Sequence, residues 1–112
     1  MEPTGKSAKA RMSRRKGQTF ERSIVNWHRE LGVRAERVPL SGAARYQGNA
    51  GDVDIYLNGD HAPLVAECKI RAKLPKCWRD WLGENCLVFM RDNHGETMVI
   101  LPARTWAKMV KR

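Results

Sequence analysis

Hydrophobic residues recur with a helical period between residues 17 and 31. Four large apolar side chains follow one another at separations of four, three and four residues, which places them on one face of a helix. They are Phe20, Ile24, Trp27 and Leu31. Gly32 follows directly, and glycine commonly ends a helix because it adopts the left-handed backbone conformation without strain. The pattern predicts an amphipathic helix over residues 17–31.

Shorter apolar runs follow, separated by turn residues. Residues 33–39, 53–57 and 64–70 are predicted strands, and the last two form a hairpin around "NGDHAP". Residues 41–51 are rich in Gly and Ala and are predicted to form a loop. Trp78, Trp81 and Leu82 indicate a short helix within residues 74–85, and residues 86–92 and 96–101 a second hairpin. A final helix begins near Pro102, which suits a first helical turn. This order predicts a small α/β domain.

Positive charge is concentrated in the N-terminal segment of the chain. The chain has 112 residues and a net charge of +9. Residues 1–16 hold six Lys or Arg and one Glu, so they contribute +5. We interpret them as a flexible basic arm that neutralises phosphates, followed by a single domain over residues 17–112. A polyanion such as DNA is therefore the expected partner.

The sequence argues against a membrane protein, a secreted protein and a zinc protein. No apolar run approaches the roughly 18 residues of a membrane helix, and no signal-type segment follows the basic N-terminus. Three cysteines form no CxxC pair, so we expect reduced thiols in a cytoplasmic protein. No spacing of His and Cys supports a zinc site.

Acidic residues gather in the first predicted hairpin. If it turns near residues 60–61, residues whose numbers sum to 121 oppose each other, so Asp54 faces Glu67 and Asp52 faces Lys69. Because alternate residues of a strand share a face, these four side chains would lie together. The opposite face would carry apolar residues for the core: Val53, Ile55, Ala66 and Cys68.

Opposed carboxylates repel each other unless a cation intervenes. One interpretation is a structural network of ion pairs with Lys69 and nearby arginines. The other is a Mg²⁺ site, because Mg²⁺ prefers oxygen ligands and can activate water for attack on a phosphodiester. Spacing alone leaves both open. We expect Asp52 to pair with Lys69 or a basic neighbour rather than to bind metal directly.

The motif "DVDI…ECK" resembles the core of the PD-(D/E)xK nuclease superfamily. The upstream "RRKGQTFER" and "RVPLSGAA" are similar to segments of archaeal-type Holliday junction resolvases and their phage relatives. The resemblance covers residues 14–70 and implies a restriction-endonuclease-like core, a mixed central β-sheet flanked by helices. The segment after Lys73 looks closer to small phage nucleases, and the resemblance implies an intracellular protein of phage or prokaryotic type.

The resemblance also implies roles for single residues. Asp54, Glu67 and the Cys68 backbone carbonyl would bind Mg²⁺, for which Mn²⁺ could substitute, and Glu21 on the first helix would complete the site. Lys69 would position or activate the attacking water. The expected DNA-binding residues are Arg14, Arg15, Lys16, Ser41 and Arg45. His28 shares the helix face of Glu21 but is more often a packed histidine in such a place.

These observations predict a Mg²⁺-dependent DNA endonuclease that resolves four-way junctions as a homodimer, since a junction presents two symmetric strands. Apolar residues of the Trp78 helix or of the last helix are candidates for the dimer interface. One alternative is a PD-(D/E)xK nuclease that acts on other branched, nicked or duplex DNA. The other is a non-enzymatic basic DNA-binding protein.

Overall fold

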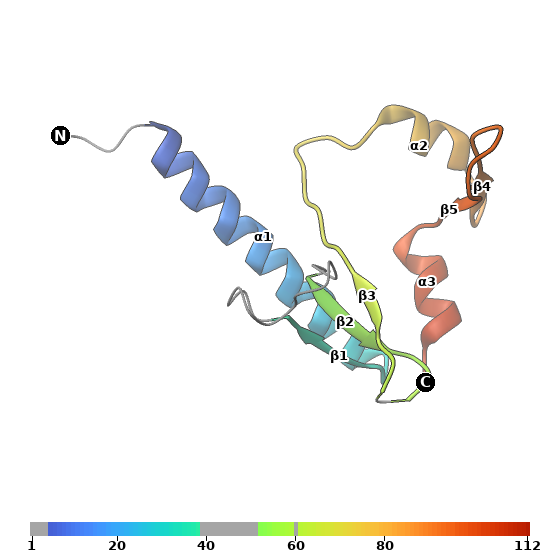
Figure 1. The fold of residues 1–112 in the computed structure, drawn as a ribbon, viewed down its shortest axis with the longest axis horizontal. Coiled ribbons are helices and arrows are strands. Elements are labelled where there is room, and N and C mark those ends of the chain that lie inside the picture. The colour runs from blue at the N-terminus through green and yellow to red at the C-terminus, as the bar shows by residue number, and fades with distance from the viewer. Residues whose placement is uncertain (1–4, 39–51, 60) are drawn as a thin grey trace. The chain divides into compact units, whose positions relative to one another are not determined.

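The computed structural model describes residues 5–38, 52–59 and 61–112, with side chains from residue 8 onward (Figure 1). Helices alternate with groups of strands along the chain, as the sequence predicts. In order they are α1 Gly5–Glu30, β1 Arg34–Arg37, β2 Val53–Tyr56, β3 Leu64–Ala66, α2 Lys76–Leu82, β4 Val88–Met90, β5 Met98–Ile100 and α3 Ala103–Val110. No helix of the described residues is both long and apolar enough to cross a membrane.

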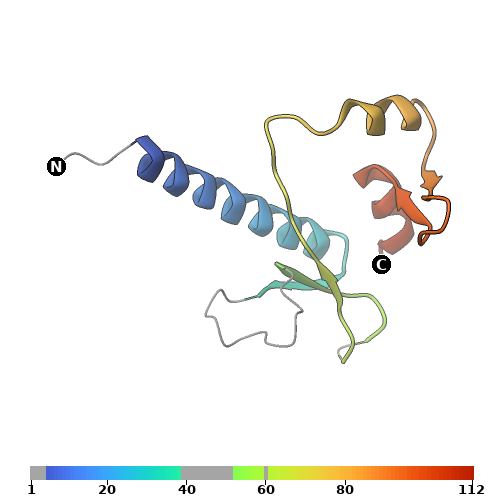
Figure 2. The same ribbon diagram turned by 45° about the horizontal axis from the view of Figure 1, so that its top comes forward.

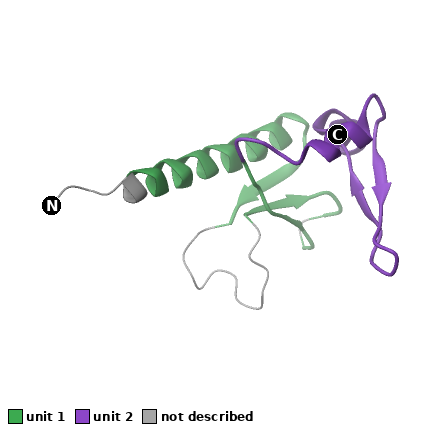
Figure 3. Ribbon diagram, turned by 90° about the horizontal axis from the view of Figure 1, so that it is seen from above, with its two compact units in different colours: residues 1–70, 112 green, residues 71–111 purple. Residues whose placement is uncertain are grey.

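The elements fall into two compact units (Figure 3). The first comprises residues 1–70 with Arg112 and holds α1 and a sheet in the order β1-β2-β3. The second comprises residues 71–111 and holds α2, the β4-β5 hairpin and α3. The α/β class is confirmed. A mixed sheet is not observed, because every strand pair in the described residues is antiparallel and joins strands adjacent in sequence. The prediction of a single domain over residues 17–112 stays a prediction.

Helix α1 begins twelve residues before the predicted start at Gly17, which is therefore wrong. Residues 5–16 consist mostly of Ala, Lys, Arg, Met and Ser, and they contain no proline. Ala, Arg, Lys and Met are strong helix formers, so the helix can extend although this segment has no apolar face to bury. Figures 1 and 2 show that the N-terminal half of α1 extends past the three-stranded sheet. The flexibility of residues 1–16 stays a prediction.

Helix α1 ends as the sequence predicts. Gly32 has a φ of 81°, in the left-handed region that favours glycine. The Gly32 N–H donates to the Arg29 carbonyl at 3.0 Å, and the Val33 N–H donates to the His28 carbonyl at 2.9 Å. These two bonds form a Schellman motif, which satisfies carbonyls at the helix end and directs the chain into β1.

The first hairpin forms, but its register differs from the predicted one. Asp54 opposes Val65, not Glu67, because paired residues have numbers that sum to 119. The register centres the turn one residue earlier, next to Gly59, whose φ of 104° suits a tight turn. A change of two in this sum preserves which residues share a face, so Val53 and Ile55 still enter the core.

The core of the first unit lies between α1 and the sheet. Five apolar residues of α1, β1, β2 and the intervening turn are buried: Val25, Val33, Ala35, Val53 and Ile55. Ala35 is paired with Ile55 across β1 and β2, so both side chains lie on the face toward α1. Alternation places Glu36 and Asp54, which also pair, on the other face.

The second unit has a smaller apolar interior. None of the residues of α2 is buried, and Trp78 and Trp81 are 39% and 52% exposed. Pro102 caps the N-terminus of α3, as predicted. The Thr105 hydroxyl donates to the Cys86 carbonyl at 2.8 Å, which ties α3 to the segment before β4.

Candidate functional site

The strands β2 and β3 separate at the segment that contains the E-C-K motif. Regular pairing ends at Ala66, whose carbonyl accepts a hydrogen bond from the Asp52 N–H at 2.8 Å. Beyond this point the Asp52 side chain takes over as acceptor, and its Oδ2 accepts the Cys68 N–H at 2.8 Å. Asp52 therefore fixes the backbone between Glu67 and Lys69 where the ladder no longer does. Its predicted partner was Lys69 or a basic neighbour, and this hydrogen bond corrects that prediction.

Glu67 and Lys69 form an ion pair across Cys68. The Lys69 Nζ lies 2.9 Å from the Glu67 Oε1, and both side chains are more than half exposed. An exposed pair contributes only about 0–1 kcal/mol, because water solvates both groups well when they separate. Either group can therefore exchange this partner for a ligand at little cost.

Glu21 occupies the face of α1 that packs against the sheet. It is 9% exposed, and its Oε1 accepts a hydrogen bond from the Arg37 Nε at 3.3 Å. Arg37 is the last residue of β1 and shares a face with Ala35, which explains why it points toward the helix. A carboxylate buried to this degree needs such a charged partner.

The pKa of the Cys68 thiol reflects the negative charge around the E-C-K motif. Its pKa is raised to about 11, first by burial and then by the charges of Asp52, Glu21 and Glu67. Each of these carboxylates disfavours a nearby thiolate, so all three act on the same place in the molecule. Glu21 and Glu67, together with Asp52, therefore all lie within electrostatic range of the Cys68 thiol.

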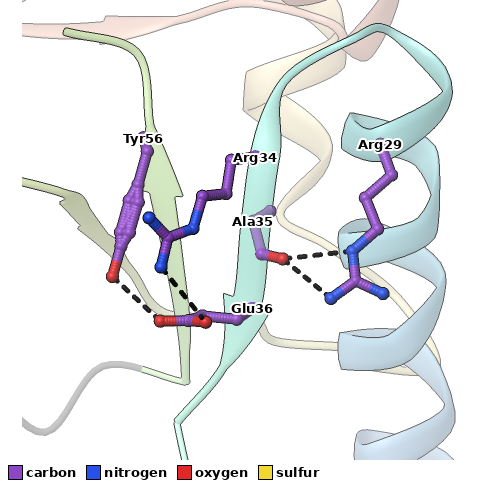
Figure 4. Close-up of polar contacts among 5 residues, drawn as sticks. All are labelled: Arg29, Arg34, Ala35, Glu36 and Tyr56. Carbon is purple, nitrogen blue, oxygen red and sulfur yellow. Dashed lines mark hydrogen bonds and ion pairs between the residues drawn. The ribbon is translucent and has the colours of Figure 1, made fainter. Parts of the chain in front are cut away.

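Asp54 lies on the other face of β2. It is 8% exposed, and its negative charge acts on Tyr56, two residues along the strand. The pKa of Tyr56 is raised chiefly because its hydroxyl donates a hydrogen bond to Glu36, at 2.9 Å. Figure 4 shows this contact together with Arg34, whose guanidinium lies 4.3 Å from the centre of the Tyr56 ring. Asp54 is thus separated by its strand from Glu21.

The types of the predicted ligands suit a hard divalent cation. Mg²⁺ prefers carboxylate oxygen, and Glu21, Asp54 and Glu67 all supply it. Among the described residues, however, no group of three His, Cys, Asp or Glu could hold a metal ion. Glu21 and Glu67 are bound to Arg37 and Lys69 instead.

His28 has the structural role that the sequence favours. It is 2% exposed, and its Nδ1 lies 2.7 Å from the Ile24 carbonyl oxygen. A carbonyl only accepts, so Nδ1 carries the proton in this contact. The ring also packs edge-on against Trp27, with centroids 5.1 Å apart.

The predicted DNA-binding residues divide into two groups. Arg14, Arg15 and Lys16 lie on α1 and are exposed. Ser41 and Arg45 lie outside the described residues. Sequence reasoning gave no role to Arg37, although "RVPLSGAA" begins with it. Its position beside Glu21 depends on the pairing of helix and strand, which no local pattern reveals.

The chain matches the model of a known protein family. The model of a family described as "Phage putative PDDEXK endonuclease" matches residues 12–82. This range covers more than half of the chain and includes Glu21, Asp54, Glu67 and Lys69. A comparison with curated proteins found no match, and neither did a comparison with solved structures.

Proposed function

The chain belongs to the "Phage putative PDDEXK endonuclease" family, and from this membership we propose that it is a Mg²⁺-dependent endonuclease that hydrolyses phosphodiester bonds in DNA. The observation that carries the proposal is the position of the match. It includes Asp54, Glu67 and Lys69, to which the resemblance to the PD-(D/E)xK motif assigns catalysis, and also Glu21 on the first helix. Two of them, Glu67 and Lys69, are held together at 2.9 Å on the segment that Asp52 fixes.

The proposed roles follow from the chemistry of each side chain. Glu67, Asp54, Glu21 and the Cys68 carbonyl supply oxygen ligands of the kind that Mg²⁺ and Mn²⁺ accept. A divalent cation, when bound, stabilises charge on a phosphodiester and lowers the pKa of a bound water. Lys69 is a three-donor cation beside Glu67 and can orient that water or stabilise the developing negative charge.

Assembly of this site requires a local rearrangement. Asp54 and Glu21 lie on opposite faces of β2, so at least one carboxylate has to move. Glu67 is the side chain that can move most easily, because it is exposed and lies beyond the last paired residue of β3. We propose that the three-stranded sheet and α1 are the part of a restriction-endonuclease-like core in which this takes place.

The substrate proposal is a four-way DNA junction, with a homodimer as the active form and an intracellular site of action. The net charge of +9 favours a polyanion of high charge density, such as branched DNA. The exposed Trp78 and Trp81 of α2 offer apolar surface for a dimer interface. The sequence similarity to junction resolvases over residues 14–70 supports the same substrate.

The experiment compares cleavage of a synthetic four-way junction with cleavage of linear duplex arms of the same sequence, in Mg²⁺. We expect paired symmetric cuts in the junction and at least tenfold slower cleavage of the duplex. Equal rates on both substrates would contradict junction specificity while leaving the nuclease proposal intact. No cleavage of any DNA in Mg²⁺ or Mn²⁺ would favour the non-enzymatic DNA-binding protein.

A further inference from the structure

Four arginines form a stripe along one side of α1. Arg15, Arg22 and Arg29 follow Arg11 by four, eleven and eighteen residues. At about 100° per residue these separations place all four within about 40° around the helix axis. All four side chains are exposed. Because α1 is one continuous helix, this alignment holds over about 27 Å at a rise of about 1.5 Å per residue.

The stripe is uniformly basic or neutral. Glu21 and Glu30 are the acidic residues of α1, and they lie about 80–100° to either side of it. Gln18 and Asn26 fall within or beside the stripe and can donate hydrogen bonds. The stripe is therefore suited to a row of anions, and its length spans about eight phosphates of one DNA strand at about 3.4 Å each.

At its C-terminal end the stripe meets a cavity of about 260 Å³, lined by Arg22, Val25, Asn26, Arg29 and Arg37. Three guanidinium groups thus surround one space. Within the part of the chain that the structure describes, Arg37 alone among them has a carboxylate partner, Glu21 at 3.3 Å. Arg29 donates two hydrogen bonds to the Ala35 carbonyl, at 3.2 and 3.1 Å (Figure 4), and these leave its charge uncompensated. Among the described residues, Arg22 has no hydrogen-bond or ion-pair partner.

We propose that the stripe Arg11–Arg15–Arg22–Arg29 and the cavity at its end bind phosphates along one DNA strand, with one phosphate seated between Arg22, Arg29 and Arg37. Planar guanidinium groups suit this ligand because they bind phosphate oxygens in pairs. The proposal rests on the proposed function in one respect, that the substrate is DNA.

The cavity also connects the stripe to the candidate site. Arg37 has five N–H donors, so it can hold Glu21 and a phosphate oxygen at the same time. A phosphate in the cavity would then lie next to the Glu21 carboxylate. DNA bound along α1 would thus be directed toward the residues to which hydrolysis is assigned.

The test is the salt dependence of binding to a fluorescein-labelled 25-base-pair duplex, measured by anisotropy in EDTA. Arg22→Gln/Arg29→Gln should reduce the slope of log K against log salt by about 2, at roughly 0.9 for each lost contact. Arg91→Gln/Arg104→Gln removes two exposed arginines from the second unit and serves as the control with the same charge change. Its slope should stay within about 0.5 of the wild-type value.

Two further variants distinguish a loss of DNA contacts from an effect on folding. Arg22→Gln alone removes a side chain without a described partner, and it should lower the slope by about 1. Arg22→Lys/Arg29→Lys keeps both charges and should restore most of the slope. An unchanged slope in the Gln double variant, or an equal loss in the control, would overturn the proposal. Because EDTA prevents metal-dependent cleavage, a protein that bound DNA this way but never cut it would refute only the proposed nuclease activity.

Discussion

Two substitutions of Asp52 distinguish a residue that positions the backbone from one that binds a metal ion. Its Oδ2 accepts the Cys68 N–H at 2.8 Å, which holds the backbone between Glu67 and Lys69. Asp52→Ala removes the acceptor, whereas Asp52→Asn removes the charge but keeps an oxygen of the same shape in the same place. A positioning residue should therefore tolerate Asn and not Ala, and a metal ligand should tolerate neither.

The expected loss of stability follows from the kind of hydrogen bond that each substitution removes. A hydrogen bond to a charged group contributes about 1.5–3 kcal/mol, and both partners here are half-buried, so the lower end applies. Asp52→Ala should lower the free energy of unfolding by about 1.5 kcal/mol and Tm by about 6 °C. Asp52→Asn keeps a neutral hydrogen bond and should cost less than about 1 kcal/mol.

Cleavage rates measure the consequence for the site. A displacement of about 1 Å at a catalytic group can cost about 10²-fold in rate, so Asp52→Ala should lose about that much in kcat. Asp52→Asn should stay within about fivefold of wild type under the same argument. Thermal unfolding and single-turnover cleavage in Mg²⁺ are the assays. An Asn variant as inactive as the Ala variant, with Tm preserved, would refute the positioning argument and assign the charge itself to catalysis.

The remaining predictions concern the stability of the protein and the reactivity of the Cys68 thiol. Gly32→Ala should destabilise the protein by about 1–2 kcal/mol in urea unfolding, because φ is 81° and the added Cβ would meet the Arg112 Cβ at 3.1 Å. Gly17→Ala, in α1 with open space around its Cβ, should instead stabilise by about 0.5–1 kcal/mol, and a destabilising effect there would contradict a helix that extends past residue 17. In a Cys77→Ser/Cys86→Ser background, alkylation of Cys68 by iodoacetamide should be slow at pH 8 and should rise toward the pKa of about 11, since burial and three carboxylates favour the neutral thiol. Asp52→Asn should shift this profile to lower pH, and an unshifted profile would show that Asp52 does not act on the thiol.

Local patterns predicted the elements well because each depends on neighbouring residues. The apolar period of Phe20, Ile24, Trp27 and Leu31 located α1, and Gly32 marked its end. Its start was missed because the residues before Gly17 favour a helix through propensity alone, without an apolar face. The strands of both hairpins were located because their apolar residues are bounded by turn residues.

The candidate site was harder to predict because it depends on pairing between distant segments. Placing the turn one residue late was enough to put Asp54 opposite Glu67 instead of Val65. The roles of Asp52 and Arg37 depend on the end of the β2–β3 ladder and on the packing of α1 against β1, respectively. Neither is encoded by spacing along the chain.

Metal-dependent cleavage by Asp54→Asn tests the central claim most directly. Wild-type protein should cut DNA in Mg²⁺ and not in EDTA. Asp54→Asn preserves the size of a residue that is 8% exposed, so it should keep DNA binding in EDTA. The account predicts that this variant loses at least about 10²-fold in cleavage rate, as expected when a metal ligand is removed. Cleavage at the wild-type rate by an Asp54→Asn protein that still binds DNA would contradict it.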